Sequence, residues 1–284
     1  MIRRLLIALA FVAAAAATAG AEGRLHALRS SQPAGSQLLY LPSGKYLRAM
    51  APGFREVMAD VLYLWSIQYY ADYRPDERSR FLEHVYAGVI TELDPHYQDP
   101  YIVGALIMAV EAGDVEMGLR LLDKGIAANP NAWLLMFEAG FYCYDTLQDY
   151  ARAARYFERA MMVPGVHPLV RRLHAEMYNL MGDRRASWRY WLEIYNTAEG
   201  DYVRSVAYRH VHDLKIQVDL ESLTSAVKAY AGRFGRFPAD LGALVEARIL
   251  SSVPHDPEGN PYVYNRNNGQ VRSAAKPLLR QRQL

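Results

Sequence analysis

The histidines His210 and His212, followed by Asp213, are the residues whose types come closest to those of a metal site. Imidazole and carboxylate groups are common ligands of transition metals. On a helix, however, side chains two residues apart do not share a face, so the two imidazoles cannot readily reach one ion. We therefore expect surface or helix-capping histidines, and we predict no metal site.

A second group of oxygen-bearing side chains, Asp256, Glu258 and Asn260, is close enough in sequence to hold a cation. The same pattern is typical of a rigid turn, in which Asp256 bonds to its own backbone and Gly259 supplies a positive φ. We favour the turn and assign structural roles to Asp256, Gly259 and Asn260. The cation site is the alternative.

Few other residues suggest catalysis. Glu92 and Asp94 could form an acid pair, but they stand just before Pro95 and are more simply a helix end. Cys143 is the only cysteine, and its aromatic neighbours indicate a small buried thiol. The chain contains no G-x-S-x-G, H-E-x-x-H or G-x-G-x-x-G motif. We predict that the protein is not an enzyme and has no cofactor, with an accessory subunit of an envelope enzyme as a less favoured alternative.

The charge balance argues against nucleic acid as a partner. The 284 residues include 32 Lys and Arg against 30 Asp and Glu, which gives a net charge of +2. Phosphate binding needs a concentrated basic face. Basic residues gather only in a short tail at 275–284, with Lys276, Arg280 and Arg282, and we expect this tail to be a loose, solvated end.

The first residues resemble an export signal. Arg3 and Arg4 precede an apolar run at residues 5–17, and a small-x-small sequence ends at Ala21. This order predicts a secretory signal peptide over residues 1–21, with an uncleaved membrane anchor as the alternative. In either case we expect an exported protein, periplasmic or anchored in the inner membrane and facing the periplasm. Membrane contact would come only through this segment if it is uncleaved.

Residues 22–53 contain several prolines and glycines and are expected to be an irregular lead-in. Helical periodicity then begins, and it continues to about residue 219. In the first helix of the first predicted hairpin, residues recur at three- and four-residue spacing: Val57, Val61, Leu64, Trp65 and Gln68. In its second helix, one face carries Phe81, Val85, Val89 and Ile90. Residues 200–220 are expected to form one further helix.

Within this region a unit of about 34 residues recurs, and its clearest copy covers residues 134–165. Large, small and turn-forming residues stand at fixed places in it: Phe137, Gly140, Tyr144, Ala153, Phe157, Ala160 and Pro164. This pattern strongly resembles the tetratricopeptide repeat family, with Gly140-Phe141 where the family has a Leu-Gly pair. The resemblance implies an α-solenoid of three to four helical hairpins over residues 54–219.

The same resemblance implies a concave groove lined by the first helix of each hairpin. Phe137, Gly140, Phe141 and Tyr144 would be packing positions of the clearest repeat. The interleaved positions would face a protein partner. In this and the next repeat they are Glu138, Tyr142, Asp145, Arg172, Glu176 and Asn179.

Residues 220–274 change in character. A helix is followed by Gly235, Phe237 and Pro238, by a short helix at 240–247, and by the turn-rich segment 254–262. Residues 262–264 and 270–273 are predicted to form a β-hairpin around Asn267-Asn268-Gly269. The order resembles the soluble domain of the type II secretion major pseudopilin. That family binds calcium in a later loop, but no carboxylate side chain follows Tyr264 here, so we do not expect its calcium site.

Together these patterns predict a mainly α fold, with a TPR-like solenoid followed by a small α+β segment. They favour a non-catalytic protein-binding scaffold or adaptor in the cell envelope of a Gram-negative bacterium. The two resemblances imply protein partners from a secretion or type IV pilus-like assembly. A periplasmic assembly chaperone for exported proteins is the alternative.

Overall fold

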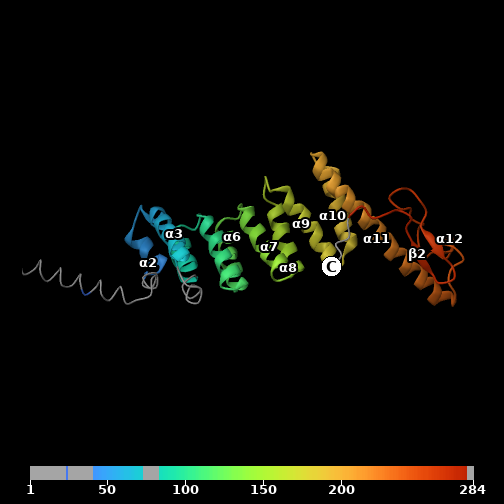
Figure 1. The fold of residues 1–284 in the computed structure, drawn as a ribbon, viewed down its shortest axis with the longest axis horizontal. Coiled ribbons are helices and arrows are strands. Elements are labelled where there is room, and N and C mark those ends of the chain that lie inside the picture. The colour runs from blue at the N-terminus through green and yellow to red at the C-terminus, as the bar shows by residue number, and fades with distance from the viewer. Residues whose placement is uncertain (1–23, 25–40, 73–82, 280–284) are drawn as a thin grey trace, which may run out of the picture. The chain divides into compact units, whose positions relative to one another are not determined.

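The computed structural model describes residue 24 and residues 41–72 and 83–279 (Figure 1). Most of these residues lie in helices, and the strands among them form a two-stranded antiparallel sheet. The predicted mainly α class is confirmed. The chain divides into two compact units, Met1–Asn129 and Pro130–Leu284. The predicted signal segment, residues 1–21, lies outside the described residues.

The first unit is built from helices of very different lengths. Its elements are α2 (Gly44–Met50), α3 (Arg55–Asp72), η4 (Glu83–Ile90), α4 (Thr91–Leu93), α5 (Asp99–Leu106), η5 (Ile107–Glu111) and α6 (Val115–Ala128). Of these, η4 and η5 are π-helical. Helix α2 lies within the segment that we expected to be irregular, so that expectation is wrong for residues 44–50. Gly44 begins this helix so close to α4 that a Cβ atom on residue 44 would clash with Cβ of Glu92.

Helix α3 buries a different face from the one predicted. Leu62 and Tyr63 are buried together with the small residues Ala59 and Ser66. The hydroxyl oxygen of Ser66 lies 2.7 Å from the carbonyl oxygen of Tyr63 and 3.1 Å from the hydroxyl of Tyr86 in η4, and it donates its single proton to one of them at a time. The small residues allow η4 to approach this side. The side chains that we predicted to be buried are exposed: Val57, Val61, Leu64, Trp65 and Gln68.

On η4, Val85, Val89 and Ile90 are buried, while Phe81 lies outside the described residues. The end of this hairpin is held by Lys124 of α6. Its ammonium group contacts the carbonyl oxygen of Ala87 (2.6 Å), Oγ1 of Thr91 (3.0 Å) and Oε1 of Glu92 (2.9 Å). Glu92 is therefore part of an ion pair.

Asp94 follows the last residue of α4, and its Oδ1 accepts the backbone N–H of His96 at 2.9 Å. Glu92 and Asp94 thus have separate structural partners. This arrangement is the helix end that we favoured over an acid pair.

In the second unit, five helices pack so that each contacts the next along the chain (Figure 1). They are α7 (Trp133–Asp145), α8 (Tyr150–Met161), α9 (Pro168–Leu180), α10 (Arg184–Thr197) and α11 (Asp201–Phe234). Asp149 and Asp183 cap the N-termini of α8 and α10, where their side chains accept the backbone N–H groups of Arg152 and Ala186. Such caps satisfy amide groups that a helix end leaves unpaired.

The contact between α7 and α8 centres on Phe157, which is fully buried. Gly140, Ala153 and Ala160 are also buried, and Phe137 and Tyr144 are partly buried. Helix α8 ends at Met161, so Pro164 lies in the turn that follows.

Two neighbouring residues of α7 have exchanged their expected roles. Phe141, expected to pack, is 37% exposed, whereas Tyr142, expected in a groove, is 6% exposed. Tyr142 shares a helix face with the fully buried Leu135 and Ala139, and its neighbour Cys143 is also fully buried. The buried arc of α7 is thus wider than one stripe, and it includes a position that the family resemblance places toward a partner.

Helix α11 is one continuous element of 34 residues. The boundary that we predicted between residues 219 and 220 therefore falls inside a helix. Gly235, with φ of 69°, ends it in the left-handed conformation that glycine adopts without a Cβ clash.

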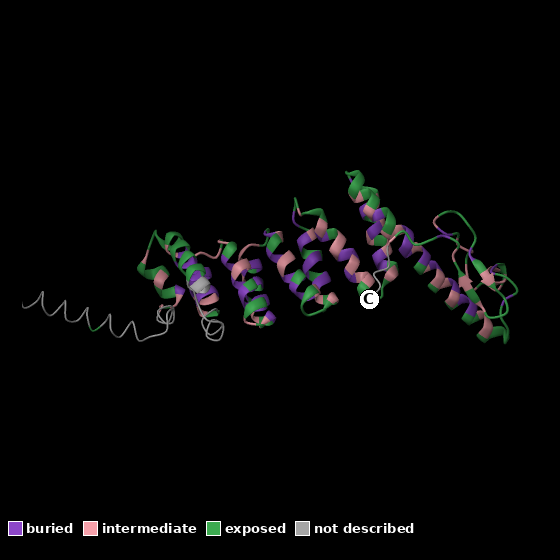
Figure 2. Cartoon of the chain, in the orientation of Figure 1, coloured by how far each residue is buried: buried purple, intermediate pink, exposed green. Residues whose placement is uncertain are grey.

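The C-terminal part of α11 carries a small second core (Figure 2). Leu223, Ala226 and Val227 of the helix pack with residues from α12 (Gly242–Glu246) and from its flanks. Strands β1 (Val263–Asn265) and β2 (Gln270–Arg272) are antiparallel, with Tyr264 opposite Val271. The hydroxyl of Tyr262 donates a 2.8 Å hydrogen bond to Oδ2 of Asp219, so this segment is joined to the middle of α11.

Candidate functional site

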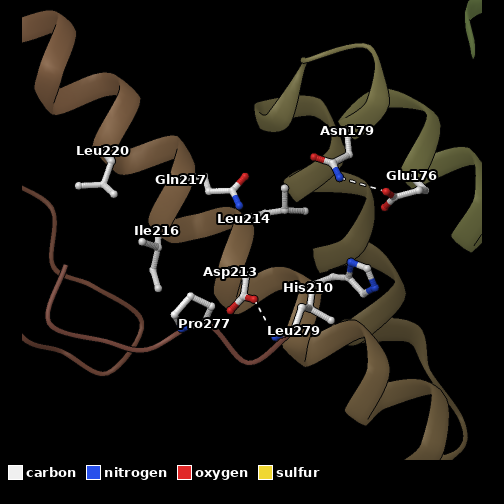
Figure 3. Close-up of a pocket in the computed structure, with 10 residues that line it drawn as sticks. All are labelled: Glu176, Asn179, His210, Asp213, Leu214, Ile216, Gln217, Leu220, Pro277 and Leu279. Atoms are coloured by element: carbon white, nitrogen blue, oxygen red, sulfur yellow. Dashed lines mark hydrogen bonds between the residues drawn. The ribbon is translucent and has the colours of Figure 1, made fainter. Parts of the chain in front are cut away.

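A pocket of about 340 Å³ lies between α9, α11 and the segment 277–279 (Figure 3). Its walls combine apolar side chains with a few polar groups. The lining residues are Glu176, Asn179, His210, Asp213, Leu214, Ile216, Gln217, Leu220, Pro277 and Leu279. Apolar pockets with a small number of placed polar groups are typical of binding sites.

Helix α9 contributes Glu176 and Asn179 to the pocket. Nδ2 of Asn179 donates a hydrogen bond of 3.1 Å to Oε1 of Glu176. Oε2 of Glu176 is buried and has no hydrogen-bond partner in the described part of the chain. Burial raises the pKa of Glu176, and the bond from Asn179 opposes this effect only in part. The wall of the pocket therefore contains a buried carboxyl oxygen whose capacity to accept a hydrogen bond is unused by the described residues.

His210 of α11 is held by stacking. Its ring is parallel to that of Trp191 within 1°, with the ring centroids 3.8 Å apart. Burial lowers the pKa of His210 to about 4, and Asp213 opposes the shift. The imidazole is therefore neutral at physiological pH, and it offers hydrogen-bonding capacity without charge.

Asp213 is the polar centre of the opposite wall. Its side chain is buried, and its Oδ1 lies 2.8 Å from Nδ1 of His212. Oδ1 also accepts the backbone N–H of Leu278 at 2.8 Å, and Oδ2 accepts that of Leu279 at 2.9 Å. One carboxylate thus holds two successive amide groups of a segment 65 residues away.

These contacts correct two expectations. His212 is buried and His210 is partly buried, so they are neither surface residues nor caps. The tail is not loose as far as it is described, because Asp213 fixes it at Leu278 and Leu279. Residues 280–284, with Arg280 and Arg282, lie outside the described residues.

The six predicted groove residues are divided by the structure. Glu176 and Asn179 meet in the pocket, and Arg172 is partly buried one turn before Glu176 on α9. The other three lie on α7 and do not line this pocket: Glu138, Tyr142 and Asp145.

The three residues on α7 differ in their surroundings. Asp145 is exposed and Glu138 is partly buried, and burial raises the pKa of the Glu138 carboxyl. Burial together with the nearby Glu138 raises the pKa of Tyr142 to about 12. The buried phenol cannot be a contact surface for a partner in this conformation.

Sequence reasoning did not place α11 in the site. The helical spacing of His210, Asp213, Leu214 and Gln217 puts them on one face, so this signal was available. The pairing of Asp213 with Leu278 and Leu279 could not be predicted from the sequence. The hydrogen bonds come from backbone N–H groups, which nearly every residue type has.

The residues weighed as a cation site form a turn. Oδ1 of Asp256 accepts the backbone N–H groups of Glu258 (3.0 Å) and Asn260 (2.8 Å), and Gly259 has φ of 85°. Burial by itself would raise the pKa of Asp256, but the hydrogen bonds from Asn260 and Glu258 lower it. Within residues 41–72 and 83–279, no group of three or more His, Cys, Asp or Glu side chains is placed to hold a metal.

Comparison of the chain with protein-family models and with curated proteins finds no match. Among the helices that the structure describes, none combines the length and apolar character needed to cross a bilayer.

Proposed function

We propose that the protein is a non-catalytic scaffold or adaptor that binds a protein partner at the α9–α11 pocket. The observation that carries this proposal is the buried Oε2 of Glu176 on a largely apolar wall, which has no hydrogen-bond partner among the residues that the structure describes. Leaving a buried acceptor without a partner costs about 1–3 kcal/mol, and a ligand with a donor group would recover that cost. The protein is proposed to have no cofactor and no nucleic-acid partner.

We further propose that the helices form a TPR-like solenoid of three to four hairpins closed by a small α+β segment. Support comes from the packing of each helix of the second unit on the next, and from the close fit of Gly140 with Phe157. The aspartate caps that follow Gly113 and Gly182 recur at the same point of two hairpins, at Asp114 and Asp183. Tetratricopeptide arrays bind polypeptide segments, which agrees with a protein ligand.

The proposed setting is the bacterial cell envelope. It rests on the signal-like residues 1–21 and on the resemblance of residues 220–274 to the type II secretion major pseudopilin. An adaptor in a secretion or type IV pilus-like assembly fits both features. A periplasmic chaperone for exported proteins is the alternative, and an accessory subunit of an envelope enzyme is less favoured.

Site-specific photo-crosslinking tests the proposal. A photoreactive residue replaces Gln217, which is exposed at the rim of the pocket, and a matched variant carries it at the exposed Arg159 of α8. In envelope fractions we expect a protein adduct at position 217 and none at 159. Equal adducts at both positions, or none at 217, would contradict the proposal. One stable adduct supports an adaptor, whereas many different adducts support the chaperone.

A further inference from the structure

The contact between Asp213 and the tail recognises a polypeptide backbone. Its two carboxylate oxygens accept the N–H groups of Leu278 and Leu279, at 2.8 and 2.9 Å. Charge-assisted bonds of this kind are roughly twice as strong as neutral ones. They would form with any two consecutive residues except proline, which lacks the N–H.

Asp213 is held in place by residues that lie outside the tail. Asp213 is 7% exposed, and Nδ1 of the buried His212 lies 2.8 Å from its Oδ1. Nε2 of His212 is 3.9 Å from Oε1 of Glu258. A buried carboxylate needs donors, so Asp213 would favour another pair of backbone N–H groups if the tail left.

The tail side chains alternate as in an extended segment. Pro277 and Leu279 line the pocket, whereas Leu278 between them is 42% exposed (Figure 3). About 340 Å³ of the pocket remains open with residues 277–279 in place, and Glu176, whose Oε2 has no hydrogen-bond partner among the described residues, also lines it.

We propose that the α9–α11 pocket is a binding site for an extended polypeptide segment, and that residues 277–279 are a resident occupant which a partner segment displaces. The partner segment has apolar side chains at alternate positions and two consecutive non-proline residues whose N–H groups reach Asp213. A side chain with an N–H or O–H donor reaches Glu176. This inference rests on the proposed function and specifies the chemistry of the partner.

The test uses the full chain and removes a single backbone donor. Leu278→Pro eliminates the N–H that binds Oδ1 of Asp213, and the matched control Leu278→Ala retains it. The probe is a fluorescent peptide with blocked ends that copies residues 274–279, Ala-Ala-Lys-Pro-Leu-Leu. We expect Leu278→Pro to bind the probe at least about tenfold more tightly than Leu278→Ala, because the resident segment is released. Equal affinities would overturn the proposal.

A second probe checks the recognition of the backbone without altering the protein. This second peptide carries proline at both leucine positions. We expect it to bind the Leu278→Pro variant at least about tenfold more weakly than the first probe does. If this peptide kept the full affinity of the first probe, Asp213 would not be recognising backbone N–H groups. Hydrogen exchange in the wild-type chain gives an independent measure: the amides of Leu278 and Leu279 should exchange more slowly than in the free peptide. Equal exchange rates in the chain and in the free peptide would show that the tail does not occupy the pocket.

The two proposals can fail separately. If the peptide results are negative while crosslinking at position 217 persists, the pocket binds protein by another mode and only the displacement mechanism is wrong. If crosslinking at 217 is absent while Leu278→Pro binds the probe, the peptide site exists but holds only the chain's own tail, and the role of the pocket as a partner site is wrong.

Discussion

Gly140 of α7 lies so close to the ring of Phe157 of α8 that a Cβ atom on residue 140 would be 2.7 Å from Cε1 of that ring. Gly140→Ala should therefore destabilise the second unit. Overpacking costs about 1–3 kcal/mol, which exceeds the gain of about 1 kcal/mol that alanine brings to a helix interior. Gly232→Ala in α11 is the control, because its Cβ would meet open space and should stabilise. Chemical denaturation measures both, and a stabilising Gly140→Ala would contradict the packing.

Phe157 should account for much of the stability of the α7–α8 contact. Its side chain is fully buried, so Phe157→Ala should lower the free energy of unfolding by about 3–5 kcal/mol. The exposed neighbour Glu158 provides a control, since Glu158→Ala should change stability little. A small loss at Phe157, comparable to that at Glu158, would show that α7 and α8 do not pack in this register.

Tyr142 should behave as a core residue. Because it is 6% exposed, Tyr142→Ala should cost about 3 kcal/mol in unfolding experiments, as for other large aromatic side chains removed from a core. Tyr142→Phe keeps the ring and should retain most of the stability. If Tyr142→Ala instead left the melting temperature unchanged and weakened partner capture, the original groove assignment would be right.

His210 should make stability depend on pH. Its pKa is lowered from 6.5 to about 4 in the folded chain, so the unfolded chain takes up the proton first as the pH falls. The contribution of neutral His210 to the free energy of unfolding is therefore fully present above about pH 6.5, and it is lost progressively as the pH falls toward 4. His210→Phe keeps an aromatic ring beside Trp191 but does not titrate. As the pH falls from 7 to 4, the free energy of unfolding of the wild type should therefore decrease more than that of His210→Phe. A difference that is constant with pH would contradict the burial of His210, and His255→Gln at an exposed site serves as the control.

Asp256 should stabilise its turn without calcium. Asp256→Ala removes the acceptor of the Glu258 and Asn260 N–H groups and should lower the melting temperature more than Asp256→Asn, which retains one oxygen. Millimolar calcium should leave the melting temperature of the wild-type chain unchanged. A rise that EDTA reverses would point to the cation site that we placed second.

The helices were largely predictable from sequence, because apolar spacing and turn residues act over short distances. The face that α3 buries was not. Periodicity marked the larger residues Val61 and Leu64, but the helix packs through Ala59 and Ser66, whose small size allows a close approach. Apolar spacing alone does not show which side a neighbour covers.

The candidate site was only half predictable. Glu176 and Asn179 followed from the family resemblance, since they occupy fixed positions of a repeat. The contact of Asp213 with Leu278 and Leu279 joins positions 65 and 66 residues apart through backbone groups, and no side-chain pattern encodes it. His212 is buried as well, with Nε2 3.9 Å from Oε1 of Glu258, and this approach also joins positions far apart in the sequence.

Helix α11 has a mechanical consequence. At 1.5 Å per residue its 34 residues form a rod about 50 Å long. It contains no proline, and its first glycine is Gly232, so it lacks the usual points of kinking. The sheet is fastened to the middle of this rod through Tyr262 and Asp219, and the tail is fastened six residues earlier at Asp213. Both attachments therefore lie within the stretch of this stiff helix that lines the pocket, so the C-terminal segment and the pocket share one rigid support.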